Sequence, residues 1–398
     1  MATKQVLVVG AGAIGLRTAL ELIRRQVKVN LRAPTPPTDP SVCSVGAGGL
    51  WMPFHCDDPR VDRWSMETLD ELIPMIGERF QDQTLVERVP AVELRRTHGG
   101  PQLDDFTKNK YTPQLGGSTI SPVLPDWTKD PRIEFQHVTV EMLSWQNIVH
   151  KMRIPSEQIL RDAGYLYAWF FKPPIVNSPV MLNYLLEQVE NEGAVDVNVE
   201  TGHYYTSIDE MRADAEALGC DTVVNCTGLG SRQLLGDNQL IGARGILLQF
   251  DRDSCVRNET VAFTSTGEAT TQDAVIAAQE PPWGTETHPM YLIARGDTIV
   301  VGGTYLEGDT EITIRDEERA RLYRNAGLLG VDVEKSTVKG EWVGFRPYRP
   351  AVRCEYDAKY CRSSNNGVRV FNNYGHGGSG WTVNVGAAKE CADALVQE

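Results

Sequence analysis

The side chain with the clearest chemical potential is Arg346, in the segment Gly340–Arg353, which reads GEWVGFRPYRPAVR. A proline follows both Arg346 and Arg349, and proline favours an extended backbone at the residue before it. A guanidinium held on a rigid strand can bind a carboxylate through two parallel hydrogen bonds. Most arginines are solvent-exposed and have no such role, so composition alone leaves an exposed arginine as the alternative. The segment makes Arg346 a candidate carboxylate ligand.

A glycine-rich turn near the beginning of the chain has the composition of a phosphate-binding loop. Gln5–Val9 is a short apolar run that is typical of a buried parallel strand. The turn after it fills the pattern G-x-G-x-x-G and leads into an amphipathic helix; its residues include Gly10, Gly12, Ala13, Ile14 and Gly15. Such glycines allow a tight turn, close approach of a pyrophosphate and packing of helix on strand, and the helix N-terminus attracts phosphate. The context favours dinucleotide binding over an ordinary strand–helix turn.

A second glycine-rich turn lies near the other end of the chain. It reads NYGHGGSGWT, follows a predicted strand at Val368–Phe371 and precedes a helix that begins near Thr382. Backbone N–H groups at a helix start can stabilise negative charge on a ligand. Two such turns predict one long cofactor held at both ends, and FAD fits that requirement. In this turn His376 is interpreted as structural rather than as a general base. The expected cofactor contacts are Gly377, Gly378, Ser379, Gly380, Trp381 and Thr382.

Three further segments are expected near the cofactor. Small residues precede Trp51 in SVGAGGLW, and such a backbone can press against a flat ligand; the alternative is a turn with Trp51 in the core. The strand that ends in NCTG places Thr227 and Gly228 at its carboxyl end, where ligands bind in doubly wound sheets. The second strand is expected at Val27–Leu31, and Arg32 follows it instead of an acidic ribose ligand, which argues against an NAD enzyme. Arg32 either contacts the adenosine part or is simply exposed. The first segment contributes Ser44, Gly48, Gly49, Leu50 and Trp51.

Composition restricts the class of protein. At 398 residues the chain suits two domains, and 41% hydrophobic and 23% charged residues are typical of a globular protein. A formal charge of −14 argues against nucleic-acid and anionic-membrane partners. No apolar run reaches the ~18 residues of a membrane span, and the first strand begins too early to leave room for a secretory signal. The eight cysteines form no C-x-x-C pair, so we expect reduced thiols, an intracellular location and no metal site.

The elements that must position these residues alternate between strand and helix patterns, which predicts an α/β fold. Asp57–Phe80 is expected to be helical, and Gly245–Phe250 and Met290–Tyr305 to be paired strands. Thr264–Pro289, between those strands, is interpreted as a long loop that forms either a lid or surface decoration. His98–Trp127 is interpreted as an insertion or surface excursion, because it is rich in Gly, Pro, Thr and Asp and lacks periodicity.

Taken in order, these motifs resemble the D-amino-acid oxidase family of FAD enzymes, which includes D-aspartate oxidases. The resemblance rests on GAGAIG, GAGGLW, VVNCTGLGSR, GFRPYRP and NYGHGGSGWT, and it extends from about Gln5 to about Leu395. It implies a Rossmann-like FAD-binding domain and a second α+β substrate domain built on a mostly antiparallel sheet. The expected domain boundaries are approximate: 1–55, 180–240 and 325–398 for the FAD domain, and 56–179 and 241–324 for the substrate domain.

The resemblance also implies roles. Arg346 matches the arginine that pairs with the substrate carboxylate, Tyr291 a tyrosine that contacts it, and Gly378 the position whose carbonyl receives the substrate amine. The implied reaction is hydride transfer from the α-carbon of a D-amino acid to flavin N5, with dioxygen as second substrate. Its products are a 2-oxo acid, ammonia and hydrogen peroxide. The family suggests peroxisomes, but the sequence ends in Leu-Val-Gln-Glu without a targeting tripeptide, so the cytoplasm is the alternative. Monomer and homodimer both stay open.

Three positions depart from the family pattern. Thr287 stands where a second tyrosine is expected, and Ser379 replaces a tyrosine beside the flavin. The extra arginine of D-aspartate oxidases would fall near Tyr305 and is absent, which favours neutral or apolar D-amino acids. The alternatives are a D-aspartate oxidase and a glycine- or sarcosine-type amine oxidase on the same scaffold. Two further alternatives come from other classes: an NAD(P)-dependent dehydrogenase and a non-catalytic flavin-binding protein.

Overall fold

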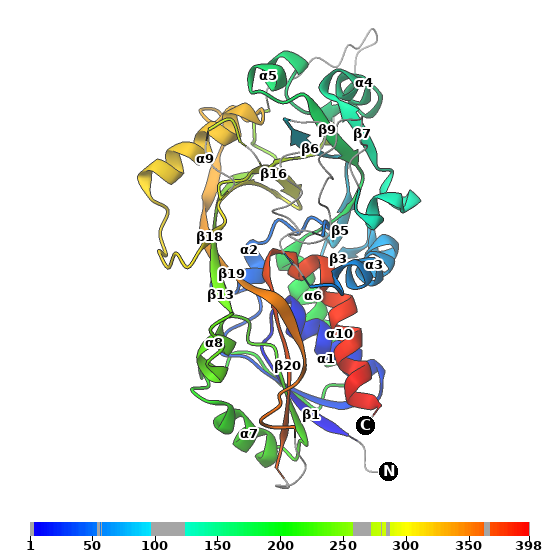
Figure 1. The fold of residues 1–398 in the computed structure, drawn as a ribbon, viewed down its shortest axis with the longest axis vertical. Coiled ribbons are helices and arrows are strands. Elements are labelled where there is room, and N and C mark those ends of the chain that lie inside the picture. Colours follow the sequence, from blue (N-terminus) through cyan, green and yellow to red (C-terminus); the bar gives the residue numbers. More distant parts are fainter. Residues whose placement is uncertain are drawn as a thin grey trace, which may run out of the picture.

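The computed structural model describes residues 4–53, 56, 58–96, 124–257, 272–279, 281–283, 287–361 and 367–397. Helices and strands alternate along these segments (Figure 1). The helices are α1 (Ala13–Arg24), α2 (Cys43–Gly46), α3 (Val61–Leu72), α4 (Val140–His150), α5 (Glu157–Asp162), α6 (Ser178–Asn191), α7 (Ile208–Ala217), α8 (Gly230–Leu235), α9 (Asp316–Leu328) and α10 (Gly380–Val396), with short 3-10 helices η1 (Ile73–Met75), η3 (Asp126–Lys129), η4 (Pro131–Ile133) and η6 (Gly377–Ser379). In these segments no helix is both long enough and apolar enough to cross a membrane.

Most strands belong to one sheet, whose order is β11-β2-β1-β12-β20-β19-β13-β17-β16-β15-β6-β9-β7, with β18 paired to β13. The strands are β1 (Gln5–Val9), β2 (Lys28–Arg32), β3 (Arg79–Phe80), β4 (Gln83–Thr84), β5 (Val86–Arg88), β6 (Ala91–Arg95), β7 (Gln136–Thr139), β8 (Met152–Arg153), β9 (Tyr167–Phe171), β10 (Pro174–Val176), β11 (Asp196–Asn198), β12 (Thr222–Asn225), β13 (Ile241–Asp251), β14 (Gln272–Asp273), β15 (Val275–Ala278), β16 (Met290–Arg295), β17 (Thr298–Gly302), β18 (Leu306–Glu307), β19 (Val338–Tyr356) and β20 (Arg369–His376).

One half of the sheet is parallel and covered on both faces. Strand β1 pairs in parallel with β2 and β12, and β12 pairs in parallel with β20. Val6 and Val8 of β1 belong to the core cluster formed with α1 and α10, whereas Leu7 and Val9 belong to the cluster formed with α7. Successive side chains of a strand point to opposite faces. Burial of both faces therefore explains why Gln5–Val9 reads as a continuous apolar run.

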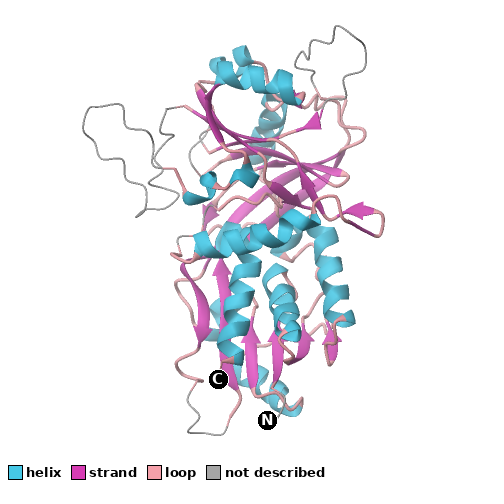
Figure 2. Ribbon diagram, turned by 90° about the vertical axis from the view of Figure 1, so that its right-hand side faces the viewer, coloured by secondary structure: helices cyan, strands magenta, loops and turns pink. Residues whose placement is uncertain are grey.

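The other half of the sheet is mostly antiparallel, and β19 joins the two halves. This strand pairs with β13 on one side and with β20 on the other. Strands β13, β17, β16 and β15 follow in antiparallel order, and β15 then pairs in parallel with β6. Figure 2 shows helices standing beside the strands in the first half and twisted strands in the second. The predicted α/β fold with a parallel part and an antiparallel part is confirmed.

Several segments differ from expectation. Helix α3 spans only Val61–Leu72 of the predicted Asp57–Phe80, because Pro74 enters the next turn, where a proline disrupts an α-helix. The interval Thr264–Pro289 is not all loop: Val275–Ala278 forms β15 inside the large sheet. This apolar run is too short for its periodicity to identify a strand.

The predicted surface excursion also needs a correction at its end. Residues 98–123 of the interval His98–Trp127 lie outside the described residues. Trp127 itself, in η3, is 4% exposed and packs edge-on against Trp51 in the core. The proposed domain boundaries stay a prediction.

Candidate active site

A cavity of about 560 Å³ lies where the carboxyl ends of the parallel strands meet one face of the antiparallel strands. Its volume is within the range of small-molecule sites, which is roughly 300–1,000 Å³. The loops after β1, β12 and β20 and the segment around α2 line one side. Side chains of β13, β15, β16 and β19 line the other side. This is the position where open α/β sheets bind their ligands.

The turn between β1 and α1 is built by two close contacts of glycines. Gly10 has a φ of +112°, and a Cβ at Gly15 would lie 1.8 Å from the carbonyl oxygen of Gly10. A larger residue at Gly15 would therefore push α1 away from the turn, and a Cβ at Gly10 would lie 2.4 Å from the carbonyl oxygen of Cys226. Helix α1 has no acidic residue in its first turn, and its N-cap, Gly12, has no side chain to cap it. The N-terminus of α1 thus faces the cavity with the polarity that suits a phosphate.

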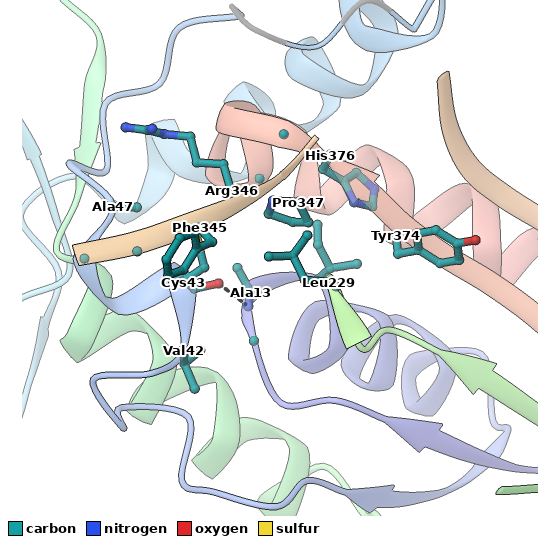
Figure 3. A pocket seen from close by; sticks show the side chains of 18 of the residues that line it. Ala13, Val42, Cys43, Ala47, Leu229, Phe345, Arg346, Pro347, Tyr374 and His376 are labelled. Atoms are coloured by element: carbon teal, nitrogen blue, oxygen red, sulfur yellow. Dashed lines mark hydrogen bonds between the residues drawn. The ribbon is translucent and has the colours of Figure 1, made fainter. Parts of the chain in front are cut away.

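Ser44 connects this first turn to the turn near the other end of the chain. Its hydroxyl oxygen accepts a hydrogen bond of 3.1 Å from the backbone N–H of Ala13 (Figure 3). Its carbonyl oxygen accepts one of 3.1 Å from the indole N–H of Trp381, at the start of α10. Helices α1 and α10 also pack against each other. The predicted two-ended arrangement of glycine-rich turns around one cavity is therefore present in the structure.

Arg346 and Tyr291 meet over a floor of glycines on the antiparallel side. A Cβ at Gly245 of β13 would lie 2.5 Å from Nη1 of Arg346, and one at Gly302 of β17 would lie 2.1 Å from Cζ of Tyr291. The Arg346 and Tyr291 side chains interact through a hydrogen bond. Arg346 also donates from Nη1 to the carbonyl oxygen of Thr304 at 2.9 Å. Two long side chains can lie flat on the sheet here because the strands beneath them carry glycine.

Arg346 has aromatic rather than acidic neighbours. The Tyr305 ring centroid lies 5.4 Å from Cζ of Arg346, and among the described residues no carboxylate forms a salt bridge with this guanidinium. Arg346 and Phe345 project from opposite sides of β19, as strand alternation requires (Figure 3). An arginine without a carboxylate partner beside a ligand-sized cavity is suited to binding a carboxylate from a ligand.

Burial sets the protonation of the other groups that line the cavity. It raises the pKa of the Tyr291 phenol above its usual range, although nearby Arg346 opposes the shift, so Tyr291 keeps its O–H as a donor. It also raises the pKa of the Cys43 thiol. Burial lowers the pKa of His376 to about 3, and Nε2 of His376 has no hydrogen-bond partner among the described residues. His376 is therefore neutral near pH 7.

Most of the predicted site residues line this cavity. They are Gly10, Gly12, Ala13, Ile14, Ser44, Gly48, Gly49, Leu50, Thr227, Gly228, Tyr291, Arg346, Gly377, Gly378, Gly380, Trp381 and Thr382. Their elements are far apart in the chain, so the cavity exists only in the folded protein.

Four predicted cofactor contacts do not line the cavity. Arg32 forms an ion pair of 2.6 Å with Asp196 of the neighbouring strand β11. Trp51 is fully buried and donates its indole N–H to the carbonyl oxygen of Ser65, so the alternative placement in the core applies. Gly15 contacts Gly10 from within α1, and Ser379 is buried at the end of η6.

Other lining residues were not predicted. Trp342 lies four residues before Arg346 on the same face of β19, and strand alternation could have identified it. Ala277 and Gln279 were assigned to a loop, so no pattern pointed to them. His203, Tyr204 and Tyr205 line the end near the carboxyl edge of β2, and only the folded arrangement brings this loop there.

Comparison with known proteins gives the family. Residues 5–394 match the family model described as FAD dependent oxidoreductase (DAO). The chain belongs to this family. This match confirms the predicted family of FAD-dependent oxidoreductases and FAD as the cofactor.

Two relatives and one solved structure show how distant the similarity is in sequence and how much of each chain it covers. A D-amino-acid oxidase of Dictyostelium discoideum is 25% identical, and the match covers 98% of this chain and 91% of the relative. A human D-aspartate oxidase is 23% identical, with 100% and 96% covered. Among solved structures, glycine oxidase from Bacillus cereus superposes with a TM-score of 0.65 at 14% identity, with 99% and 95% covered. At this identity the structural match establishes the fold alone.

The residues around the cavity fit FAD. The N-terminus of α1, where Ser44 occupies the N–H of Ala13, can take the diphosphate on its other N–H groups, and Gly12 leaves room for close approach. At the other end, Gly377, Gly378 and Gly380 present backbone at the start of α10. FAD, when bound, supplies a two-electron acceptor at this site.

Proposed function

We propose that this FAD-dependent oxidoreductase oxidises neutral D-amino acids, with dioxygen as the electron acceptor and 2-oxo acid, ammonia and hydrogen peroxide as products. The observation that carries the proposal is the pair formed by Arg346 and Tyr291. A guanidinium without a described acidic partner and a protonated phenol lie together at a cavity that also receives the cofactor. That pair is suited to an α-carboxylate, which every amino acid carries.

Arg346 and Tyr291 would fix the substrate by its carboxylate. The free N–H groups of the guanidinium and the O–H of Tyr291 donate to the two oxygens, which leaves the α-carbon facing into the cavity. The carbonyl of Gly378, on the opposite wall, would accept from the substrate amine. With carboxylate and amine fixed, only one enantiomer presents its α-hydrogen to the cofactor. Positioning of this kind can contribute roughly 7–11 kcal/mol to catalysis, so no side-chain base is required.

The surroundings of Arg346 favour neutral substrates. The resemblance to D-aspartate oxidases predicts a second arginine near Tyr305 for enzymes that bind an acidic side chain. In this chain Tyr305 lies beside Arg346, and no second arginine lines the cavity among the described residues. A second carboxylate would therefore enter an apolar cavity unpaired, which is costly.

Anaerobic titration of the purified holoenzyme tests the proposal. The visible flavin spectrum would be followed on addition of D-alanine, D-leucine, D-aspartate, glycine and sarcosine, with L-leucine as the stereochemical control. We expect D-alanine and D-leucine to bleach the flavin, and peroxide to appear when air is admitted. Bleaching by D-aspartate alone, by glycine or sarcosine alone, or by none of the compounds would refute it.

A further inference from the structure

A buried arginine follows two cavity-lining residues on strand β16. Tyr291, Ile293 and Arg295 are alternate residues of this strand, so their side chains point to the same face of the sheet. Tyr291 and Ile293 line the cavity. Ile293 also packs against the segment around α2, because a Cβ at Gly48 would lie 2.4 Å from its Cδ1. Arg295 therefore lies on the cavity-facing side of the sheet, next to this segment.

The guanidinium of Arg295 reaches the wall of the cavity through one hydrogen bond. Its Nη2 donates to the carbonyl oxygen of Val45 at 3.1 Å. That carbonyl belongs to the peptide that joins Val45 to Gly46, and Gly46 and Ser44 both line the cavity. The positive charge of Arg295 therefore lies one peptide unit behind the cavity wall.

The charge of Arg295 has no ion-pair partner among the described residues, although the residue is only 4% exposed. In the same part of the chain, Nε and Nη1 have no hydrogen-bond partner. Asp297, an acid whose charge reaches Arg295, has a mostly exposed side chain and pairs with Lys339 at 2.8 Å. Burial lowers the pKa of Arg295 to about 10, so the guanidinium stays protonated at pH 7. A buried charge without a counter-ion is costly, and a negative charge in the cavity would offset part of this cost.

We propose that Arg295 raises the midpoint potential of bound FAD by stabilising the negative charge that the flavin gains on reduction. Reduction by two electrons and one proton adds one such charge. The diphosphate is expected at the turn before α1, so the flavin occupies the part of the cavity lined by Tyr291 and Ile293; this placement rests on the proposed function. A unit charge about 10 Å away, at an effective dielectric constant of about 20, changes the equilibrium for adding one negative charge by roughly tenfold.

The midpoint potential of the flavin in holoenzyme variants tests this proposal. Each protein would be reduced with dithionite at pH 7 in the presence of a reference dye, so the measurement needs no substrate. In Arg295→Gln we expect the equilibrium constant for reduction to fall at least about fivefold, which corresponds to about 20 mV for a two-electron couple. Arg295→Met removes the charge without leaving a buried amide and should give a similar fall. Arg295→Lys keeps the charge at pH 7 and should fall by less than about fivefold.

Arg257→Gln is the matched control, since Arg257 is also buried, at 8% exposure, and does not line the cavity. Its potential should stay close to that of the wild type. Flavin content, FAD affinity and melting temperature would be compared for all variants, so that a folding defect is recognised.

Three results would overturn the proposal. The first is a smaller fall than expected in both charge-removing variants of Arg295. The second is an equal fall in Arg257→Gln or in Arg295→Lys, which would assign the effect to packing or to the bond with Val45. The third is weaker FAD binding with an unchanged potential, which would assign Arg295 to the diphosphate. If D-amino acids bleach the wild type, the proposed function stands in all three cases. If none does, the proposed function is wrong, and the potentials still decide the role of Arg295.

Discussion

At the scale of single residues, the environment of Arg346 decides what the cavity can bind. Its guanidinium donates to a backbone carbonyl and to no described carboxylate, and aromatic rings surround it. In such surroundings a planar guanidinium binds best to a planar group with two acceptor oxygens, such as a carboxylate, because it can donate two parallel hydrogen bonds to it. The proposed binding of an amino acid therefore requires an arginine at position 346, and a positive charge alone is not sufficient.

Arg346→Lys tests this directly. Lysine keeps the positive charge but loses the paired N–H groups, so we expect KM for D-amino acids to rise at least tenfold while flavin content stays unchanged. Arg349→Lys, the other arginine of GFRPYRP that precedes a proline, forms an ion pair with Asp237 and serves as control. Steady-state peroxide assays measure both. An unchanged KM in Arg346→Lys would remove this arginine from substrate binding.

His376 gives a prediction for pH. Its pKa is about 3 in the folded protein and about 6.5 when unfolded, so the unfolded state binds more protons between these values. The contribution of neutral His376 to the free energy of unfolding is therefore present above pH 6.5 and is lost as the pH falls toward 3. Between pH 7 and pH 5 we expect the loss to be about 2 kcal/mol. Urea unfolding of wild type and His376→Gln at both pH values measures it; equal pH dependence in the two proteins would contradict the assignment.

At the scale of elements, glycines in adjacent strands place the reactive side chains. Gly302 of β17 lies under the ring of Tyr291, where an added methyl would be 2.1 Å from Cζ. We expect Gly302→Ala to displace Tyr291 and to lower kcat/KM at least tenfold, with flavin content maintained. Gly340→Ala, on β19, has its nearest neighbour 3.9 Å away and should leave kinetics unchanged. Wild-type kinetics in Gly302→Ala would show that this floor does not position Tyr291.

The first turn of α1 allows a separate prediction about cofactor uptake. A valine side chain at Gly12 would fill the space where backbone approaches the diphosphate, and its Cβ would already lie 3.3 Å from Oγ of Ser44. We expect Gly12→Val to be purified colourless and to remain so after soaking with FAD. Gly340→Val should be as yellow as the wild type. The ratio of absorbance at 450 nm to 280 nm distinguishes them, and a fully loaded Gly12→Val would contradict the phosphate-loop assignment.

Local signals explain which elements could be predicted. The turn Gly10–Gly15 and the strand before it follow from residues close together in sequence, so they were predicted correctly. Leu50 lines the cavity, whereas the next residue, Trp51, enters the core. This alternation depends on an isolated β-bridge between Leu50 and Ile175, which neighbouring residues in the sequence could not predict. Glu93 of β6 and Ala277 of β15 lie opposite each other although they are far apart in sequence, because the sheet register brings them together.

At the scale of the whole molecule, both ends of the chain contribute to one binding site. Residues 10–16 and 377–385 line the cavity or flank it, and Ser44 bonds to both turns. We therefore expect FAD to slow hydrogen exchange in these two segments together, with one concentration midpoint. Exchange measured across an FAD titration tests this, and α5, none of whose residues lines the cavity, is the internal control. Protection of one segment only would mean that the cofactor is held at one end.

The bonds of Ser44 also set when the protein can acquire its cofactor. During synthesis the β1–α1 turn leaves the ribosome first, while β20 and α10 are made hundreds of residues later. Because the cavity wall needs Ala13 and Trp381 bonded to the same residue, a growing chain that lacks α10 has only half a binding surface. FAD capture therefore follows the completion of α10, and ribosome-bound chains that stop before Gly377 should emerge without flavin.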